Sequence, residues 1–192
     1  MIDLAVSKLQ NRLRELAWLD LVGGIARQQK LLVGDKEKTL PAMVDPEDPG
    51  RYLLLVPSSD RSGISYFEVR DNRKLYDLSG GRAFMMSATV RVVVWLNTQR
   101  IAPAAGANEA FASVVSKLSG SYSDVSPISN ISVTPMQEVP RGPEIFSRWT
   151  YDETETQFLM LPFEYFAFDF EMNYVLSAGC AVGNIVRTEI QC

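Results

Sequence analysis

The chain has 192 residues, of which 46% are hydrophobic and 10% aromatic, and its 19 basic and 23 acidic side chains give a net charge of −4. A chain of this length and composition can close one core that buries roughly two thirds of its extended surface, so we predict a single domain over residues 1–192. With a negative net charge, the protein has no overall positive electrostatic potential that would attract the phosphate backbone, which argues against nucleic acid as the main ligand.

Histidine is absent from the sequence, and this removes several common chemistries. Imidazole is the side chain best suited to proton transfer near neutral pH and the commonest neutral metal ligand. The two cysteines, Cys180 and Cys192, lack the further ligands that a zinc site needs. We interpret them as reduced thiols, with a disulfide between them as the alternative. The sequence therefore predicts no metal and no cofactor.

The first residues, Met1-Ile2-Asp3-Leu4, carry an acidic residue and no basic stretch leading into an apolar run, unlike an export signal. No window of the sequence is long and apolar enough to cross a bilayer. We therefore expect a protein that is made in the cytoplasm without export.

The first predicted element is an amphipathic helix over residues 2–19. Apolar residues recur there at three- and four-residue steps, and polar residues fill the opposite side. Gly23-Gly24 is predicted to stop it. The helix either packs on a sheet, which we favour, or docks the end that carries Trp18, Leu19 and Leu21 on a neighbouring subunit.

Between residues 25 and 78 short apolar runs alternate with short polar segments, which predicts a meander of hairpins. Its strands are expected at residues 31–33, 40–44, 52–56 and 64–69. Residues 34–38 predict a hairpin tip, and the proline-rich residues 45–50 predict a rigid acidic loop.

Two kinds of ligand site were weighed in this region. Asp45, Glu47 and Asp48 are calcium-type ligands, but their spacing differs from that of an EF-hand loop, so a solvated turn is preferred. Residues 34–39 lack the second glycine and the Gly-Lys-Thr core of a phosphate-binding loop, and residues 79–82 are followed by a strand rather than a helix. Both glycine segments are interpreted as turns.

Residues 86–97 are the first of two long alternating segments. The even-numbered positions from Met86 to Leu96 are all apolar, so this face is predicted to lie in the core. The other face is mixed, with Arg91 and Trp95 two pleats apart. These two residues form either a contact patch for another subunit or part of an ordinary half-exposed sheet surface.

A second amphipathic helix is predicted over residues 108–118. Asn108 is a good N-cap, apolar residues recur at helical spacing, and Gly120 is placed to end the helix. We expect this helix to cover the sheet. After a serine-rich loop, residues 131–134 predict a strand that ends early or lies at an edge, because Pro135 follows it.

Residues 139–157 form a loop excursion that is too long and too aromatic for a simple turn. Arginine and aromatic side chains are typical anchors of protein–protein interfaces. The segment therefore either contacts another subunit or folds back on its own domain. Its candidate interface residues are Arg141, Phe146, Trp149 and Tyr151.

The second long alternating segment covers residues 163–176. Its even-numbered positions from Phe166 to Tyr174 are aromatic or apolar and are predicted to lie in the core. Asp169 and Glu171 share the other face one pleat apart, as an acid and base pair would. Their alternation with an aromatic face favours a solvated surface or an inter-subunit charge contact over catalysis. Residues 177–192 are small and mixed, and predict a C-terminal arm.

Together these elements predict an α+β fold, in which one antiparallel β-sheet is flanked by an N-terminal helix and one central helix. An open sheet has edges that must be covered or paired, and closing a ring of copies is one way to pair them. No catalytic residue is predicted. The candidate interface residues are Arg91, Trp95, Arg141, Phe146, Trp149, Tyr151, Asp169 and Glu171.

The order of elements resembles the tail-terminator and tail-completion (neck) proteins of tailed bacteriophages. The resemblance is carried by residues 2–19, by Val90-Arg91-Val92-Val93-Val94-Trp95-Leu96, by residues 108–118 and by residues 166–176. It implies a homo-oligomeric ring, commonly of six subunits, that caps the tail tube and joins it to neck or head-completion proteins. It also implies a virion protein that assembles in the host cytoplasm, contacts no membrane and meets DNA only by passage through the lumen.

Two other classes of function were weighed. A small-molecule or protein binding module of α+β type would use the aromatic residues between 146 and 170 as pocket walls. An enzyme without histidine would use Asp169, Glu171 or Cys180. We favour the structural subunit over both.

Overall fold

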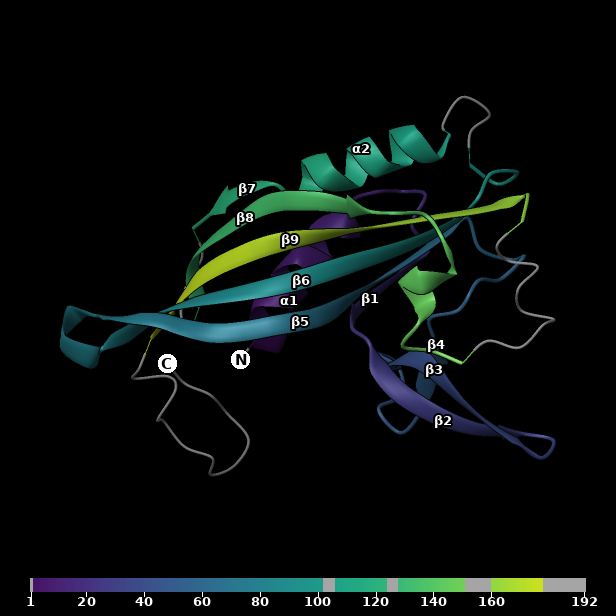
Figure 1. The fold of residues 1–192 in the computed structure, drawn as a ribbon, viewed down its shortest axis with the longest axis horizontal. Helices are drawn as coiled ribbons and strands as arrows, with labels where there is room; N and C mark the ends of the chain where they lie inside the picture. The colour runs from purple at the N-terminus through teal and green to yellow at the C-terminus, as the bar shows by residue number, and fades with distance from the viewer. Residues whose placement is uncertain (1, 102–105, 124–127, 151–159, 178–192) are drawn as a thin grey trace.

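The computed structural model describes residues 2–101, 106–123, 128–150 and 160–177. Within them, helices and strands form an α+β fold, as predicted (Figure 1). In chain order the elements are α1 (Ile2–Leu13), β1 (Leu21–Ile25), β2 (Arg27–Val33), β3 (Lys36–Val44), β4 (Tyr52–Leu54), β5 (Gly63–Leu78), the 3₁₀ turn η1 (Ser79–Gly81), β6 (Ala83–Asn97), α2 (Ala107–Leu118), β7 (Gly120–Tyr122), β8 (Ile128–Val139), the 3₁₀ turn η2 (Pro143–Phe146) and β9 (Phe163–Ser177).

The strands form two sheets, where the sequence predicted a single antiparallel one. The main sheet has six strands in the order β1-β5-β6-β9-β8-β7, and β2, β3 and β4 form a separate three-stranded sheet. Neighbours in the main sheet are antiparallel except β1 and β5, which are parallel. The chain leaves the main sheet after β1, builds the small sheet and returns as β5, and such a long connection permits parallel pairing.

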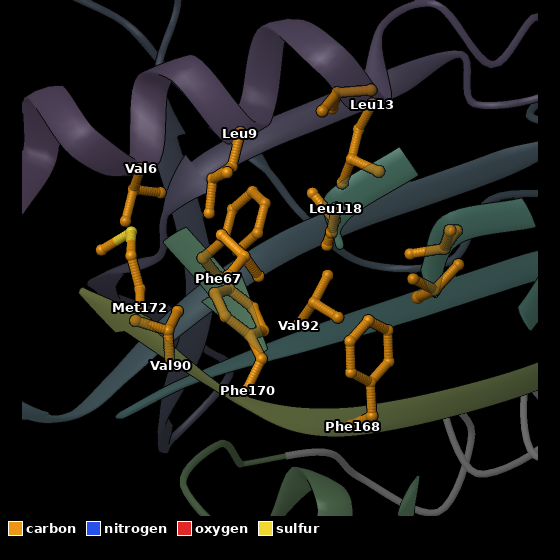
Figure 2. Packing of buried hydrophobic residues seen from close by; sticks show 14 of the residues in the cluster. Val6, Leu9, Leu13, Phe67, Val90, Val92, Leu118, Phe168, Phe170 and Met172 are labelled. Carbon is orange, nitrogen blue, oxygen red and sulfur yellow. The ribbon is translucent and has the colours of Figure 1, made fainter. Parts of the chain in front are cut away.

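The first face of the main sheet is covered by both helices, as expected from the alternating patterns. Figure 2 shows Leu9 and Leu13 of α1 and Leu118 of α2 above Phe67 and Phe170. The predicted even-numbered residues of β6 from Ala88 to Leu96, and those of β9 from Phe166 to Tyr174, belong to this buried cluster. Two alternating strands with aromatic side chains on one face therefore form the centre of the core.

The second face of the main sheet is also partly buried, which the sequence did not show. Val93 and Trp95 of β6 and Ala167 of β9 lie in a second hydrophobic cluster with Leu55 and Phe146. This cluster fills the space between the sheet, the η2 segment and the chain that follows β4. Part of the mixed face is thus core rather than a half-exposed surface.

The predicted ends of both helices need correction. Helix α1 ends at Leu13, not at residue 19, and continues as a series of tight turns that bury Leu19. Gly23 and Gly24 do not stop a helix but lie in β1, where a Cβ on Gly23 would come within 2.8 Å of a Leu55 methyl carbon. The N-cap of α2 is Gly106 rather than Asn108.

Several strands are longer than their sequence patterns predicted. β5 continues to Leu78 and β8 runs from Ile128 through Pro135 to Val139. The hairpin tip predicted at residues 34–38 is shorter in the structure, because β3 begins at Lys36, whereas the turn predicted at residues 79–82 is confirmed. Gly34, Gly80 and Gly81 all have positive φ angles. Figure 1 shows the β5–β6 hairpin reaching beyond the two helices, and we call the exposed residues 70–77 of this hairpin the hairpin arm.

Candidate interaction surface

Arg91 and Asp169 form an ion pair on the second face of the main sheet, directly opposite each other on β6 and β9. Arg91 Nε and Nη2 donate to the two carboxylate oxygens of Asp169 at 2.7 and 2.9 Å. The side chains are only 14% and 13% exposed. The hydrogen bond to Asp169 raises the pKa of Arg91 above its ordinary value, although burial opposes it. These two predicted interface residues are therefore paired with each other within one chain.

Glu68 is a buried carboxylate beside this pair. It was not predicted from the sequence as a candidate residue. It lies opposite Arg91 on β5 and is fully buried. The indole Nε1 of Trp149 donates to its Oε1 at 2.9 Å, and Arg70 Nη2 lies 3.1 Å from its Oε2. The sequence pattern that could have identified it is an alternation: Glu68 follows Ile64 and Tyr66 at every second residue and so shares their strand face.

Three of the predicted interface aromatics are buried inside the subunit. Trp95 stacks on Phe146 with ring centroids 4.5 Å apart, and Trp149 meets the ring of Tyr66 edge-on at 6.2 Å. Ile145, Phe146 and Trp149 all belong to the second hydrophobic cluster. Of the two alternatives for residues 139–157, the described part folds back on its own sheet. Trp95, Phe146 and Trp149 are buried within the subunit.

We expect Trp149→Phe to lower the free energy of unfolding by about 1–3 kcal/mol, because it leaves a buried acceptor of Glu68 without its donor. Urea unfolding followed by circular dichroism measures this change. Trp18→Phe is the matched control, since Trp18 is only partly buried and its indole makes no hydrogen bond to a described residue. Equal losses in the two variants would contradict a specific role for the Trp149 indole.

The remaining candidate interface residues have different surroundings. Glu171 is half-buried and accepts a hydrogen bond from Ser87 Oγ at 3.0 Å. Arg141 donates to Glu138 and to Asn108, which ties the segment after β8 to the start of α2. Tyr151 lies outside the described residues, as do Cys180 and the predicted arm after Ser177.

Both long edges of the main sheet are only half covered within the described residues. β1 pairs with β5 from Ile64 to Phe67, and beyond Phe67 the only described strand that pairs with β5 is β6. β7 pairs with β8 from Ile131 to Val133, and beyond Val133 the only described partner of β8 is β9. Each edge thus presents backbone groups that another strand can bind.

The described residues bring no metal-binding cluster together. No three of their Asp, Glu or Cys side chains converge on a point that could hold a metal ion. Asp169 is bound to Arg91, and Glu171 to Ser87, so the acid and base pair weighed from the sequence is engaged in structural contacts. Neither described helix is long and apolar enough to cross a lipid bilayer.

Three surface cavities of about 490, 560 and 500 Å³ lie among the described residues. The first lies between the end of α1 and the small sheet, the second lies along β2, and the third lies at the start of α2. Polar and apolar groups line them in similar proportion, and none includes the aromatic residues between 146 and 170. Phe146, Trp149, Phe166, Phe168 and Phe170, which would have walled a small-molecule pocket, are buried in the two hydrophobic clusters instead.

The charged side chains of the second face are thus paired within the subunit. Among the described features, the two half-covered sheet edges are the best suited to bind another chain. Comparison with protein-family models, curated proteins and solved structures found no match to this chain.

Proposed function

We propose that this protein is a structural virion subunit, which assembles with copies of itself into a ring that ends a phage tail tube and joins it to the head or neck. The proposal is carried by the pair of half-covered edges on opposite sides of one sheet. A subunit with two different free edges can bind one neighbour at each edge. Repeated contacts of this head-to-tail kind close into a ring when the rotation between neighbours allows it.

The arrangement of the core supports an assembly role. The helices cover one face of the sheet, and η2 with the small sheet covers part of the other. The half-covered edges carry the backbone groups that another subunit can bind. The charged groups of the second face are engaged with each other rather than directed at a ligand. The net charge of −4 suits a lumen that lets DNA pass without holding it.

Native mass spectrometry and negative-stain electron microscopy of the full-length chain test this function. We expect a closed oligomer with a central opening, formed in solution or on one end of tail tubes purified from the virus. A chain that stays monomeric and does not bind tubes would contradict the proposal. Binding along the whole tube would indicate a sheath-type subunit instead, and tight binding of duplex DNA at low salt would contradict the passive lumen.

A further inference from the structure

We infer that two strand segments left uncovered by the described residues pair with each other between copies: part of β5 in one copy pairs, antiparallel, with part of β8 in the next copy. The segments are residues 71–76 and residues 134–139. The inference rests on the proposed function, because it specifies the contact between neighbours in the ring. It concerns backbone pairing at two edges that lie on opposite sides of the same sheet.

The strand directions favour this pairing. β5 is antiparallel to β6, β6 to β9 and β9 to β8, so β5 and β8 run in opposite directions. A neighbour that continues the sheet therefore places its β8 antiparallel to β5. The same short-strand arrangement occurs at each edge: β1 covers β5 only as far as Phe67, and β7 covers β8 only as far as Val133.

The two free segments fit each other with a stagger. Arg73 lies level with Ser87 of β6, whereas Gln137 lies level with Asp169 and hence with Arg91. Pairing Arg73 with Gln137 of the neighbour shifts the copies by the four residues from Ser87 to Arg91, about 14 Å at 3.4 Å per residue. A stagger between neighbours is what a sheet needs in order to close on itself.

The two segments carry opposite net charges and exposed apolar side chains. Residues 71–76 have a net charge of +1 and residues 134–139 a charge of −1, although Lys74 and Glu138 also pair with Asp77 and Arg141 of their own copy. Large apolar side chains are exposed on both segments, at 44% for Leu75, 52% for Tyr76 and 59% for Met136. Apolar groups on an unpaired edge favour association with another strand.

The alternative pairing of β5 with β5 of a second copy is less favourable. An antiparallel pair centred on the same free segment would place Arg73 and Lys74 of one copy against those of the other. Like charges directly opposite each other destabilise a strand pair. Pro135 and the register irregularities at Val69–Asp71 and Lys74–Tyr76 further restrict the registers that either edge can adopt.

Disulfide cross-linking tests the contact. In a background with Cys180→Ser and Cys192→Ser, Arg73→Cys and Gln137→Cys are made separately and together, and each variant is checked for the unchanged circular dichroism spectrum. We expect mixed single variants to give a covalent dimer, and the double variant to give a ladder that ends at the ring. Arg73→Cys combined with Asp35→Cys, which is exposed in the β2–β3 turn of the separate three-stranded sheet, is the matched control and should give no ladder.

The outcomes separate this inference from the proposed function. Rings of the unmodified chain without the Arg73–Gln137 cross-link would overturn the inference alone. A covalent dimer of Arg73→Cys by itself would show that β5 pairs with β5 and would also overturn it. Absence of rings and of tube binding for the unmodified chain would overturn the proposed function.

Discussion

Phe170→Ala is expected to lower the free energy of unfolding by about 3–5 kcal/mol, the usual loss when a fully buried phenylalanine is truncated. Phe170 lies in β9 at the centre of the first face, where it meets the ring of Phe67 edge-on at 6.3 Å and faces α1 (Figure 2). Truncation leaves a cavity that the two central strands and the helix cannot easily close. Against a typical total of about 5–15 kcal/mol, this loss should be large.

Equilibrium urea unfolding at 25 °C measures the change. Tyr52→Ala is the control, because Tyr52 is an aromatic residue on β4 that is about half exposed and outside both hydrophobic clusters. Its substitution should change the unfolding free energy by less than about 0.5 kcal/mol. If the two variants lost similar stability, the packing of β9 against α1 described above would be wrong.

Arg91→Met should cost about 3 kcal/mol of unfolding free energy. It removes the guanidinium between Asp169 and Glu68 and leaves two carboxylates on a sheltered sheet face. Removing one partner of a buried ion pair typically costs about 3–5 kcal/mol, and the residual exposure of this pair places the expectation at the lower end.

The double variant Arg91→Met with Asp169→Leu distinguishes loss of the pair from loss of packing. Replacing both partners by apolar groups removes the unpaired Asp169 charge, so we expect it to recover much of the loss. Chemical denaturation of the wild type, both single variants and the double variant gives the coupling energy. A double variant less stable than Arg91→Met would contradict an ion pair that is confined to one subunit.

The sequence predicted the core face of the main sheet because two strands carried an unbroken alternation. Val90, Val92 and Val94 in one strand, and Phe166, Phe168 and Phe170 in the other, repeat every second residue, and only a strand with one buried face requires that period. The structure pairs Val92 with Phe168 and places both under the helices. The α+β class followed from these strands and from the two amphipathic helices.

The second face could not be predicted in the same way. Trp95, Phe146 and Trp149 have the composition of interface anchors, but composition does not show whether such residues pack on their own chain or on another. Their partners come from Leu55 just after β4, from β5 and from η2, which are distant from one another in sequence. The local pattern therefore left two alternatives, and only the fold decided between them.

The hairpin arm was not predicted as strand because its sequence has no apolar pattern at all. Residues 70–77 are exposed on both faces, so no apolar period marks them as a strand. Their strand conformation comes from pairing with β6 through the turn at Gly80 and Gly81. Helix α1 was predicted too long because Leu16, Trp18 and Leu19 continue an apolar spacing, although they reach the core from turns.

The position of β9 in the main sheet has a consequence during synthesis. β9 is the last described strand in the chain, yet it lies between β6 and β8 at the middle of the sheet. About 80 residues separate the end of β6 from the end of β9, which a ribosome takes roughly 4–16 s to translate. Until then Val90, Val92 and Val94 have β5 on one side but lack β9 on the other, so nascent or prematurely terminated chains should depend on chaperones and aggregate without them.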